Sequence, residues 1–332
     1  MSNSIMAREA AEAPQRIAEQ LAANAATVAQ VVAQIGLRKP KFVYMVGRGS
    51  SDHAGVFAKY LIEIEIGLPV AAAAPSIASV YNKSLQLTDA LVLVISQSGR
   101  SPDILAQVEM AKRSGAMVVA LVNDTTSPLA ALAHYTLPLH VGAEKAVAAT
   151  KSYLATLSAI LQLVSVWSGN TALQQAVLQL PQSLQAAIAL PAQLTTDALA
   201  QVAHLVVLGR GLGYAIAREI ALKLKEVCGI HAEAFSSAEF LHGPVTLVKN
   251  QFAIVDVTIE DESLAAHRAQ IEDVQGRGAA VVQLHHRGIT ADARVLPLLL
   301  LQRFYLDVEV VARSRGINPD APPGLNKVTK TL

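Results

Sequence analysis

The sequence predicts an α/β protein of two tandem, doubly wound parallel sheets with helices on both faces. Short apolar runs rich in β-branched residues alternate with helical segments, which is typical of parallel sheets covered by helices. The chain is 52% hydrophobic but only 4% aromatic, so aliphatic residues must form the core, and these suit strands buried on both faces. A strand–turn–helix pattern also occurs twice, which indicates a duplicated unit.

The two copies of this pattern match part by part. In the first copy, an apolar run over 41–46 leads into VGRGSSDHAG and a helix that ends near Gly67. In the second copy, the run 204–208 leads into LGRGLGYAIA and a helix that ends near Gly229. The same offset aligns ALVLVISQS (90–98) with FAIVDVTIE (252–260), and a shift of one residue aligns GAMVVAL (115–121) with GAAVVQL (278–284).

The repeat defines the domain organisation that we expect. A helical segment occupies residues 1–35, a first domain 36–170 and a second domain 171–316. Residues 317–332 form an irregular tail, because their Pro and Gly spacing does not permit a regular helix. Ligands of open parallel sheets bind at the carboxyl ends of the strands, so the loops that follow strands are the first places to look for a site.

Composition argues against several classes of function. The net charge of +1 gives no basis for a nucleic-acid or membrane-surface partner. The single cysteine, Cys228, allows neither a disulfide within the chain nor a CxxC metal site, and we expect no metal and no cofactor. The first residues lack a signal-peptide pattern, and the most apolar helical stretch, 152–167, is too short to span a bilayer. We therefore expect a cytoplasmic protein.

The two GRG turns do not fit a dinucleotide site. The dinucleotide fingerprint needs a glycine or alanine at its sixth position, which is Asp52 in the first copy and Tyr214 in the second. The second turn is most simply a tight strand-to-helix connection. In the first, Gly49, Ser50 and Ser51 open a helix, where the hydroxyls either cap the helix or contact an anion.

The segment SQSGRSPD predicts a phosphate site. It follows the strand 90–95 and concentrates hydroxyls, an amide and free backbone N–H groups at the start of a helix, where a phosphate monoester binds well. A serine used only as a helix N-cap remains the alternative. The second copy has the acidic segment VTIEDES at this place, which would repel phosphate and leaves that loop for different work. The predicted phosphate-binding side chains are Ser96, Gln97, Ser98 and Ser101.

Lys223 and Glu226 are candidates for proton transfer. They lie three residues apart near the end of an apolar helix and so share one helical face. We expect this helix end near the ligand-binding edge of the second sheet, where a partly desolvated carboxylate could move a proton between adjacent carbons. A surface ion pair would have the same spacing, and the sequence leaves both interpretations open.

Three further positions draw attention. His242 lies in a Gly-Pro loop, a better place for a functional histidine than an apolar helix face. Lys327 would be a solvated charge on a disordered tail, or a mobile amine able to reach a carbonyl if the tail folds back. His285 and His286 follow a strand with no third ligand nearby, so we interpret them as structural.

Several motifs together resemble the sugar isomerase (SIS) family. They are VISQSGRSPD, GAEKAVAATKSY, LGRGLGYAIAREIALKLKEVCGIHAEAF and EFLHGP. The similarity covers about residues 40–332 and is closest to the isomerase half of glucosamine-6-phosphate synthase. It implies two flavodoxin-like SIS subdomains.

The resemblance also implies a role for each candidate. Ser51, Ser96, Gln97, Ser98 and Ser101 would hold the phosphate and nearby sugar hydroxyls, and Val147 and Ala149 would line the sugar. Glu226 would move the proton between C1 and C2 with Lys223 beside it, and Lys327 would form a Schiff base with the ketose. His242 would open the sugar ring from the partner subunit, which implies a homodimer with shared active sites.

The sequence departs from the family pattern at two residues and in its domain content, and the second departure decides which function we expect. Arg100 stands where the family has Glu, and Ser101 where it has Thr. No glutaminase domain that would supply ammonia is present in this sequence, so the resemblance favours a stand-alone deaminase that converts glucosamine 6-phosphate to fructose 6-phosphate and ammonia. The alternatives are a deglycase or deaminase of another 6-phosphosugar amine, such as fructosamine or galactosamine 6-phosphate, and a non-catalytic sugar-phosphate sensor.

Overall fold

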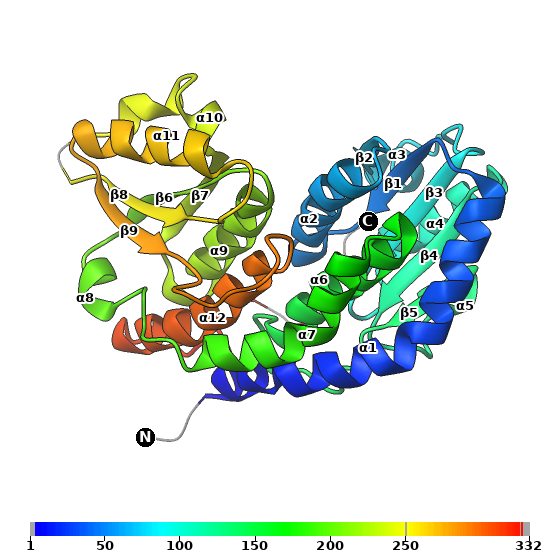
Figure 1. The fold of residues 1–332 in the computed structure, drawn as a ribbon, viewed down its shortest axis with the longest axis horizontal. Helices are drawn as coiled ribbons and strands as arrows, with labels where there is room; N and C mark the ends of the chain where they lie inside the picture. The colour runs from blue at the N-terminus through cyan, green and yellow to red at the C-terminus, as the bar shows by residue number, and fades with distance from the viewer. Residues whose placement is uncertain (1–3, 250, 326, 328–332) are drawn as a thin grey trace. The chain divides into compact units, whose positions relative to one another are not determined.

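A computed structural model describes residues 4–249, 251–325 and 327 (Figure 1). The chain divides into two compact units. The first-sheet unit contains Gln15–Glu144 and Lys151–Leu178. The second-sheet unit contains the described part of Met1–Pro14, together with Lys145–Thr150 and Gln179–Lys327. The α/β class with two parallel sheets and a helical N-terminus is confirmed.

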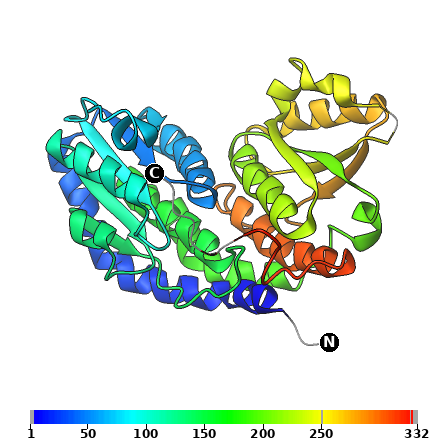
Figure 2. The ribbon, with the colours of Figure 1, turned by 180° about the vertical axis from the view of Figure 1, so that it is seen from behind.

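The first sheet has five parallel strands in the order β2-β1-β3-β4-β5. Every residue of β3 and β4 is buried, because helices cover both faces of the sheet (Figures 1 and 2). Residues such as Val92 and Val94 pack against α4 and α5 on one face. The strands are β1 (Phe42–Val46), β2 (Val70–Ala72), β3 (Ala90–Ile95), β4 (Met117–Val122) and β5 (Tyr135–Pro138).

Helix α6 forms the centre of the other helical layer in this unit. It contacts α2, and buried amide side chains join it to α1. Gln20 of α1 donates to the Ala155 carbonyl at 2.9 Å, and Gln162 of α6 donates to the Leu21 carbonyl at 2.7 Å. The helices that belong wholly or partly to this unit are α1 (Ile5–Arg38), α2 (Ser50–Glu65), α3 (Ser76–Ser79), α4 (Pro102–Arg113), α5 (Pro128–Leu132), α6 (Lys151–Ser168) and α7 (Thr171–Ile188).

The second sheet has four parallel strands in the order β7-β6-β8-β9, the same order as the first four strands of the first sheet. This match agrees with the duplication inferred from the sequence. Its strands are β6 (His204–Gly209), β7 (His231–Ser236), β8 (Ala253–Val257) and β9 (Ala280–Leu284). Its helices are α8 (Thr196–Leu199), α9 (Leu212–Cys228), α10 (Ser237–Phe240), the 3-10 helix η1 (Pro244–Leu247), α11 (Leu264–Gly276) and α12 (Leu296–Ser314).

The described tail residues contain no helix and fold back onto the second-sheet unit. The Asp320 carboxylate accepts hydrogen bonds from the backbone N–H groups of Ile5 and Met6, at 2.9 and 2.8 Å. The Asp320 carbonyl accepts the Val147 N–H at 3.1 Å. The two bonds to Ile5 and Met6 satisfy N–H groups in the first turn of α1, which would otherwise lack partners. Within the described residues, no helix combines the length and the apolar character that a bilayer span requires.

Candidate functional site

The loop after β3 begins a helix at Pro102, and glycine gives this loop its shape. Gly99 has φ +63°, and an added Cβ would lie 2.3 Å from the Ser127 hydroxyl, so no other residue fits without movement. The Gly99 N–H donates to the Ser96 hydroxyl at 3.2 Å. Ser101 occupies the N-cap position of α4, but its side chain makes no capping hydrogen bond. A plain helix cap therefore does not explain the Ser101 hydroxyl.

The first Gly-rich turn lies beside this loop, because β1 and β3 are neighbours paired from Phe42↔Ala90 to Val46↔Val94. Gly49 has φ 55° at the start of α2, and Ser50 and Ser51 form the first helical residues. Arg48 joins the two loops through a 2.8 Å ion pair with the buried carboxylate of Asp103. The structure thus brings together Gly49, Ser50, Ser51, Ser96, Gln97, Ser98 and Ser101 at one edge of the first sheet.

Arg100, which departs from the family pattern, points to a neighbour on the next loop. Its guanidinium lies 2.7 Å from the Asp124 carboxylate. Hydrogen bonds from Thr126 and Arg100 lower the pKa of Asp124 to about 2. The positive charge of Arg100 is therefore paired at neutral pH, and the donors that the loop leaves for an anion are mainly hydroxyl and N–H groups.

Lys223 is buried in the second-sheet unit between two carboxylates. Its side chain is 1% exposed, and its Nζ lies 3.3 Å from Glu219 Oε1 and 2.6 Å from Glu226 Oε2. Burial alone would lower the pKa of Lys223, but the adjacent carboxylates of Glu219 and Glu226 raise it above its usual value. The interpretation as a surface ion pair is therefore wrong, because the lysine has no access to solvent.

Glu226 is the accessible member of this buried group. Its side chain is 21% exposed, whereas that of Glu219 is fully buried and lies 3.5 Å from the Tyr305 hydroxyl. Sequence reasoning missed Glu219, although its i,i+4 spacing to Lys223 was a usable signal. Glu226 thus combines contact with a fixed cation and contact with solvent, as a proton-transfer group requires.

The position of Glu226 corrects one expectation. Helix α9 ends at Cys228, and the chain then enters β7 at His231, which pairs with His204, the first residue of β6. The end of α9 therefore lies at the amino edge of the second sheet, not at the predicted carboxyl edge. The reason is general: a helix that connects parallel strands must return the chain to the edge where the next strand begins.

Cys228 takes no part in this charged group. It is buried, and its thiol lies 3.7 Å from the Val308 carbonyl. Burial raises the pKa of Cys228 to about 12, so the sulfur stays protonated at neutral pH and is a poor nucleophile.

Lys327 folds back onto the segment 145–150. Its Nζ donates to the Ala146 carbonyl at 2.6 Å, so the alternative of a freely solvated charge does not hold. Val147 and Ala149 are partly exposed and alternate with the buried residues Ala146 and Ala148. The structure thus places Lys327 beside the two predicted sugar-lining residues.

His242 is exposed in the turn after α10, where its backbone N–H donates to the Glu239 carbonyl at 3.0 Å. The predicted phosphate-binding residues belong to the first-sheet unit. Glu226, Lys223, His242, Lys327, Val147 and Ala149 belong to the second-sheet unit.

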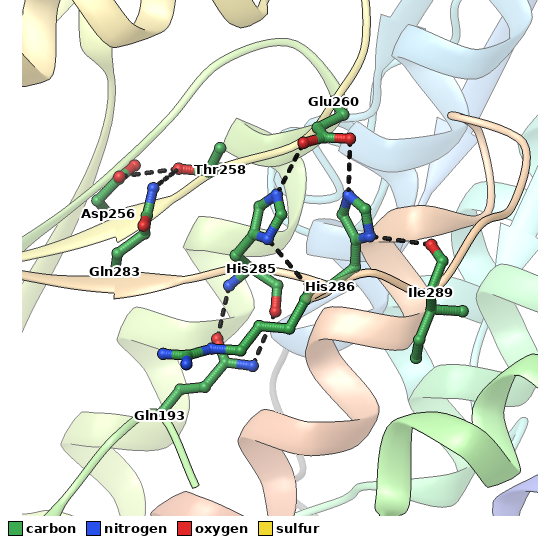
Figure 3. Close-up of polar contacts among 9 residues, drawn as sticks. Gln193, Asp256, Thr258, Glu260, Gln283, His285, His286 and Ile289 are labelled. Carbon is green, nitrogen blue, oxygen red and sulfur yellow. Dashed lines mark hydrogen bonds and ion pairs between the residues drawn. The ribbon is translucent and has the colours of Figure 1, made fainter. Parts of the chain in front are cut away.

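The position of Glu260 overturns the reason for interpreting His285 and His286 as structural, which was the lack of a third ligand nearby. Its carboxylate lies 3.2 Å from the Nε2 atom of each histidine, so a third potential ligand is present after all (Figure 3). Burial opposes ionisation of Glu260, but the two histidines hold its pKa below the usual range. Burial lowers the pKa of the His285 imidazole most, and the charge of the neighbouring His286 lowers it further.

Comparison with known proteins shows the family. The SIS domain profile matches residues 36–166 and 198–289. A glutamine–fructose-6-phosphate aminotransferase [isomerizing] of Symbiobacterium thermophilum is 31% identical over 97% of this chain and 58% of its own length. The chain belongs to the SIS domain family. The resemblance inferred from the motifs is thereby confirmed, while the chain spans little more than half the length of this relative.

Two solved structures share the SIS fold of this chain. A proposed phosphosugar isomerase from Silicibacter pomeroyi is 40% identical, with a TM-score of 0.90 over 96% of this chain and 100% of that one. A glucosamine-6-phosphate deaminase from Thermotoga maritima superposes with a TM-score of 0.77 over 99% of this chain and 100% of that one. At 21% identity, the second comparison speaks for the fold alone.

Replacing Lys223 should strongly destabilise the SIS fold. The Lys223→Met substitution removes the cation beside the fully buried Glu219 carboxylate, and breaking a buried pair in this way costs about 3–5 kcal/mol. Urea denaturation followed by circular dichroism measures the loss. Lys225→Met is the matched control, because Lys225 is exposed on the same helix and should change the free energy of unfolding by less than about 0.5 kcal/mol. Equal stability of the two variants would contradict this account of Lys223.

Proposed function

We propose that this SIS protein is an amino-sugar-phosphate deaminase and isomerase that converts glucosamine 6-phosphate and water to fructose 6-phosphate and ammonia. The observation that carries the proposal is the buried Glu219–Lys223–Glu226 group with its single accessible carboxylate. Family membership and the SIS relatives support a phosphosugar isomerase. The deaminase activity is the more specific part of the proposal.

The chemistry assigns Glu226 to the proton transfer. In the open-chain substrate, Glu226 takes the proton from C2 and returns a proton to C1, while a second proton passes from the amino nitrogen to the C1 oxygen. The 2-amino aldose thereby becomes a 2-imino ketose. The Lys223 ammonium, 2.6 Å from Glu226 Oε2, holds this carboxylate in position for both transfers. His242 is the candidate for opening the sugar ring beforehand.

Lys327 is the candidate for releasing ammonia. Its amine adds to C2 of the imino sugar, ammonia leaves, and water then hydrolyses the lysine Schiff base to fructose 6-phosphate and the free amine. The segment 145–150 holds this amine, since Lys327 Nζ bonds to the Ala146 carbonyl. Val147 and Ala149, the predicted sugar-lining residues, lie nearby and are partly exposed.

The loop after β3 supports recognition of a phosphate monoester. Its hydroxyl and N–H donors lie at a helix start, and the charge of Arg100 is already engaged by Asp124. The same loop would hold any 6-phosphosugar amine, so fructosamine and galactosamine 6-phosphates belong in the substrate panel.

Catalysis explains the structure better than a sensor role does. Burying Lys223 and Glu219 requires removal of both charges from water, and apolar residues of similar size are often at least as stable in such positions. A protein that only binds sugar phosphate gains nothing from this arrangement. The ammonia released from a panel of aminosugar 6-phosphates is the experiment that tests the proposal and selects the substrate.

The Ser98→Ala substitution should raise KM for the sugar phosphate. The lost hydrogen bond to a charged group is worth about 1.5–3 kcal/mol, which corresponds to a factor of roughly ten to one hundred. Steady-state kinetics on glucosamine 6-phosphate measure the change, with Ser84→Ala at an exposed position as control. Unphosphorylated glucosamine should not react, and equal turnover of the two sugars would disprove the phosphate assignment.

The Glu226→Gln substitution should lower kcat by about 10²–10⁴-fold, because an amide cannot serve as general base. Sugar-phosphate binding should remain close to that of the unchanged protein. Deuterium from solvent should enter C1 or C2 of recovered sugar phosphate with the unchanged protein but not with the variant. Glu272→Gln, at an exposed position of α11, is the control. Near-normal turnover by Glu226→Gln would place the base elsewhere.

A mixture of inactive variants should test whether active sites are shared in a homodimer. We propose that the exposed His242 completes the site of a second copy. Hybrid dimers of Glu226→Gln and His242→Ala chains would then contain one site with both residues intact, and partial activity should return on mixing. Subunit exchange is verified with differently labelled chains. Complete exchange without any return of activity would show that each site is built from one chain.

A further inference from the structure

Two imidazoles and a carboxylate meet where β8 and β9 end (Figure 3). Glu260 follows β8, and His285 and His286 follow β9; the register pairs Val257 with Leu284 and brings these loops together. One ligand atom from each of the three side chains lies within 4.8 Å of the others. We propose that Glu260, His285 and His286 bind a divalent transition-metal ion. This inference is independent of the deaminase proposal.

The donor set determines the class of ion. Two imidazole nitrogens and one carboxylate suit Zn²⁺ and neighbouring first-row metals, whereas Mg²⁺ and Ca²⁺ prefer oxygen donors alone. The His285 and His286 side chains are 22% and 7% exposed, and that of Glu260 is 44% exposed. The site is thus enclosed on the histidine side and open on the carboxylate side, which leaves coordination positions for water or an anionic ligand.

His286 is oriented as a metal ligand. Its Nδ1 lies 3.0 Å from the Ile289 carbonyl, which can only accept, so Nδ1 carries a proton and the neutral ring has its lone pair on Nε2. Nε2 is buried without a hydrogen bond, although it lies 3.2 Å from the Glu260 carboxylate. A lone pair that faces a carboxylate at this distance needs a cation between them. A backbone carbonyl on the other ring nitrogen is also the usual support for a metal-bound histidine.

His285 requires one proton shift to become a ligand. Its Nδ1 accepts the Arg287 N–H at 3.1 Å, which places the ring proton on Nε2, the nitrogen that faces Glu260. On metal binding, Nε2 releases this proton to solvent, Nδ1 takes up another, and the hydrogen bond to Arg287 breaks. The ring is neutral before and after this exchange. The backbone of His285 does not need to move, because both its N–H and its carbonyl are bound to the Gln193 amide, each at 2.7 Å.

A second histidine pair in the same unit provides a natural control. His204 and His231 begin β6 and β7, and their Nδ1 atoms lie 3.4 Å apart. Among the described residues, only Glu260, His285 and His286 form a group of three His, Cys, Asp or Glu side chains close enough to share a metal ion. Two neighbouring histidines without the carboxylate should therefore bind a metal ion more weakly.

The test is titration of tag-free, chelator-stripped full-length protein with Zn²⁺ against a chromophoric chelator. We expect one ion per chain, and binding at least about tenfold weaker in Glu260→Gln and in His286→Asn. The His231→Asn variant should bind as the unchanged protein does. Because Glu260 is partly exposed, its Gln variant should fold even if the His286 variant does not, and thermal denaturation in the presence of chelator checks this.

Nitrogen-15 NMR of the histidine rings tests the geometry separately from affinity. The metal-free protein should show His285 protonated on Nε2, and added Zn²⁺ should convert it to the Nδ1-protonated form. Binding that survives in Glu260→Gln, or that disappears in His231→Asn, would overturn the proposal. Absence of saturable binding would show that a proton on His286, and not a metal ion, bridges it to Glu260.

Discussion

The return path of each connecting helix is the constraint on which the arrangement of candidate residues depends. Parallel strands must all start at one edge, so each helix begins near the carboxyl ends and finishes near the amino ends. Ser96–Ser101 lie where a helix begins, and Glu226 lies where one finishes. The two groups therefore occupy opposite kinds of sheet edge in different compact units. In dinucleotide-binding folds, the ligand binds at the carboxyl edge of a single sheet, at the point where the strand order reverses. A site of that kind would need both groups at carboxyl edges.

The buried charges of α9 carry a large desolvation cost. Lys223 and Glu219 are almost completely removed from water, and their mutual attraction offsets a desolvation cost of several kcal/mol per ion. This pair gives Glu226 a cation whose position cannot drift, because Lys223 is packed in the core. An exposed lysine would have provided the same charge with many conformations. This fixed geometry supports the proposed role of Glu226 in proton transfer better than an ordinary exposed helical ion pair would.

Local signals in the sequence were sufficient for the duplication and for strands β1, β3, β4, β6, β8 and β9, since β-branched runs such as 90–95 coincide with buried strands. Strands β2, β5 and β7 were not predicted. Contacts between distant residues were not predictable in the same way. The fold-back of Lys327 depends on Asp320 binding the start of α1, and Glu260 reaches His285 only through the pairing of β8 with β9. The burial of Lys223 depends on packing between α9 and α12, which its spacing to Glu226 cannot reveal. These features are tertiary, whereas propensity and periodicity report on local structure.

The duplication also allows the charges of two equivalent loops to be compared position by position. The alignment of ALVLVISQS with FAIVDVTIE places Ser98 opposite Glu260, at the same position after equivalent strands. In the first copy this position offers a hydroxyl beside a helix start, which suits an anion. In the second it offers a carboxylate that faces two imidazoles, which suits a cation. One backbone framework therefore presents opposite electrostatic environments, because a carboxylate replaces a neutral donor and histidines follow the neighbouring strand.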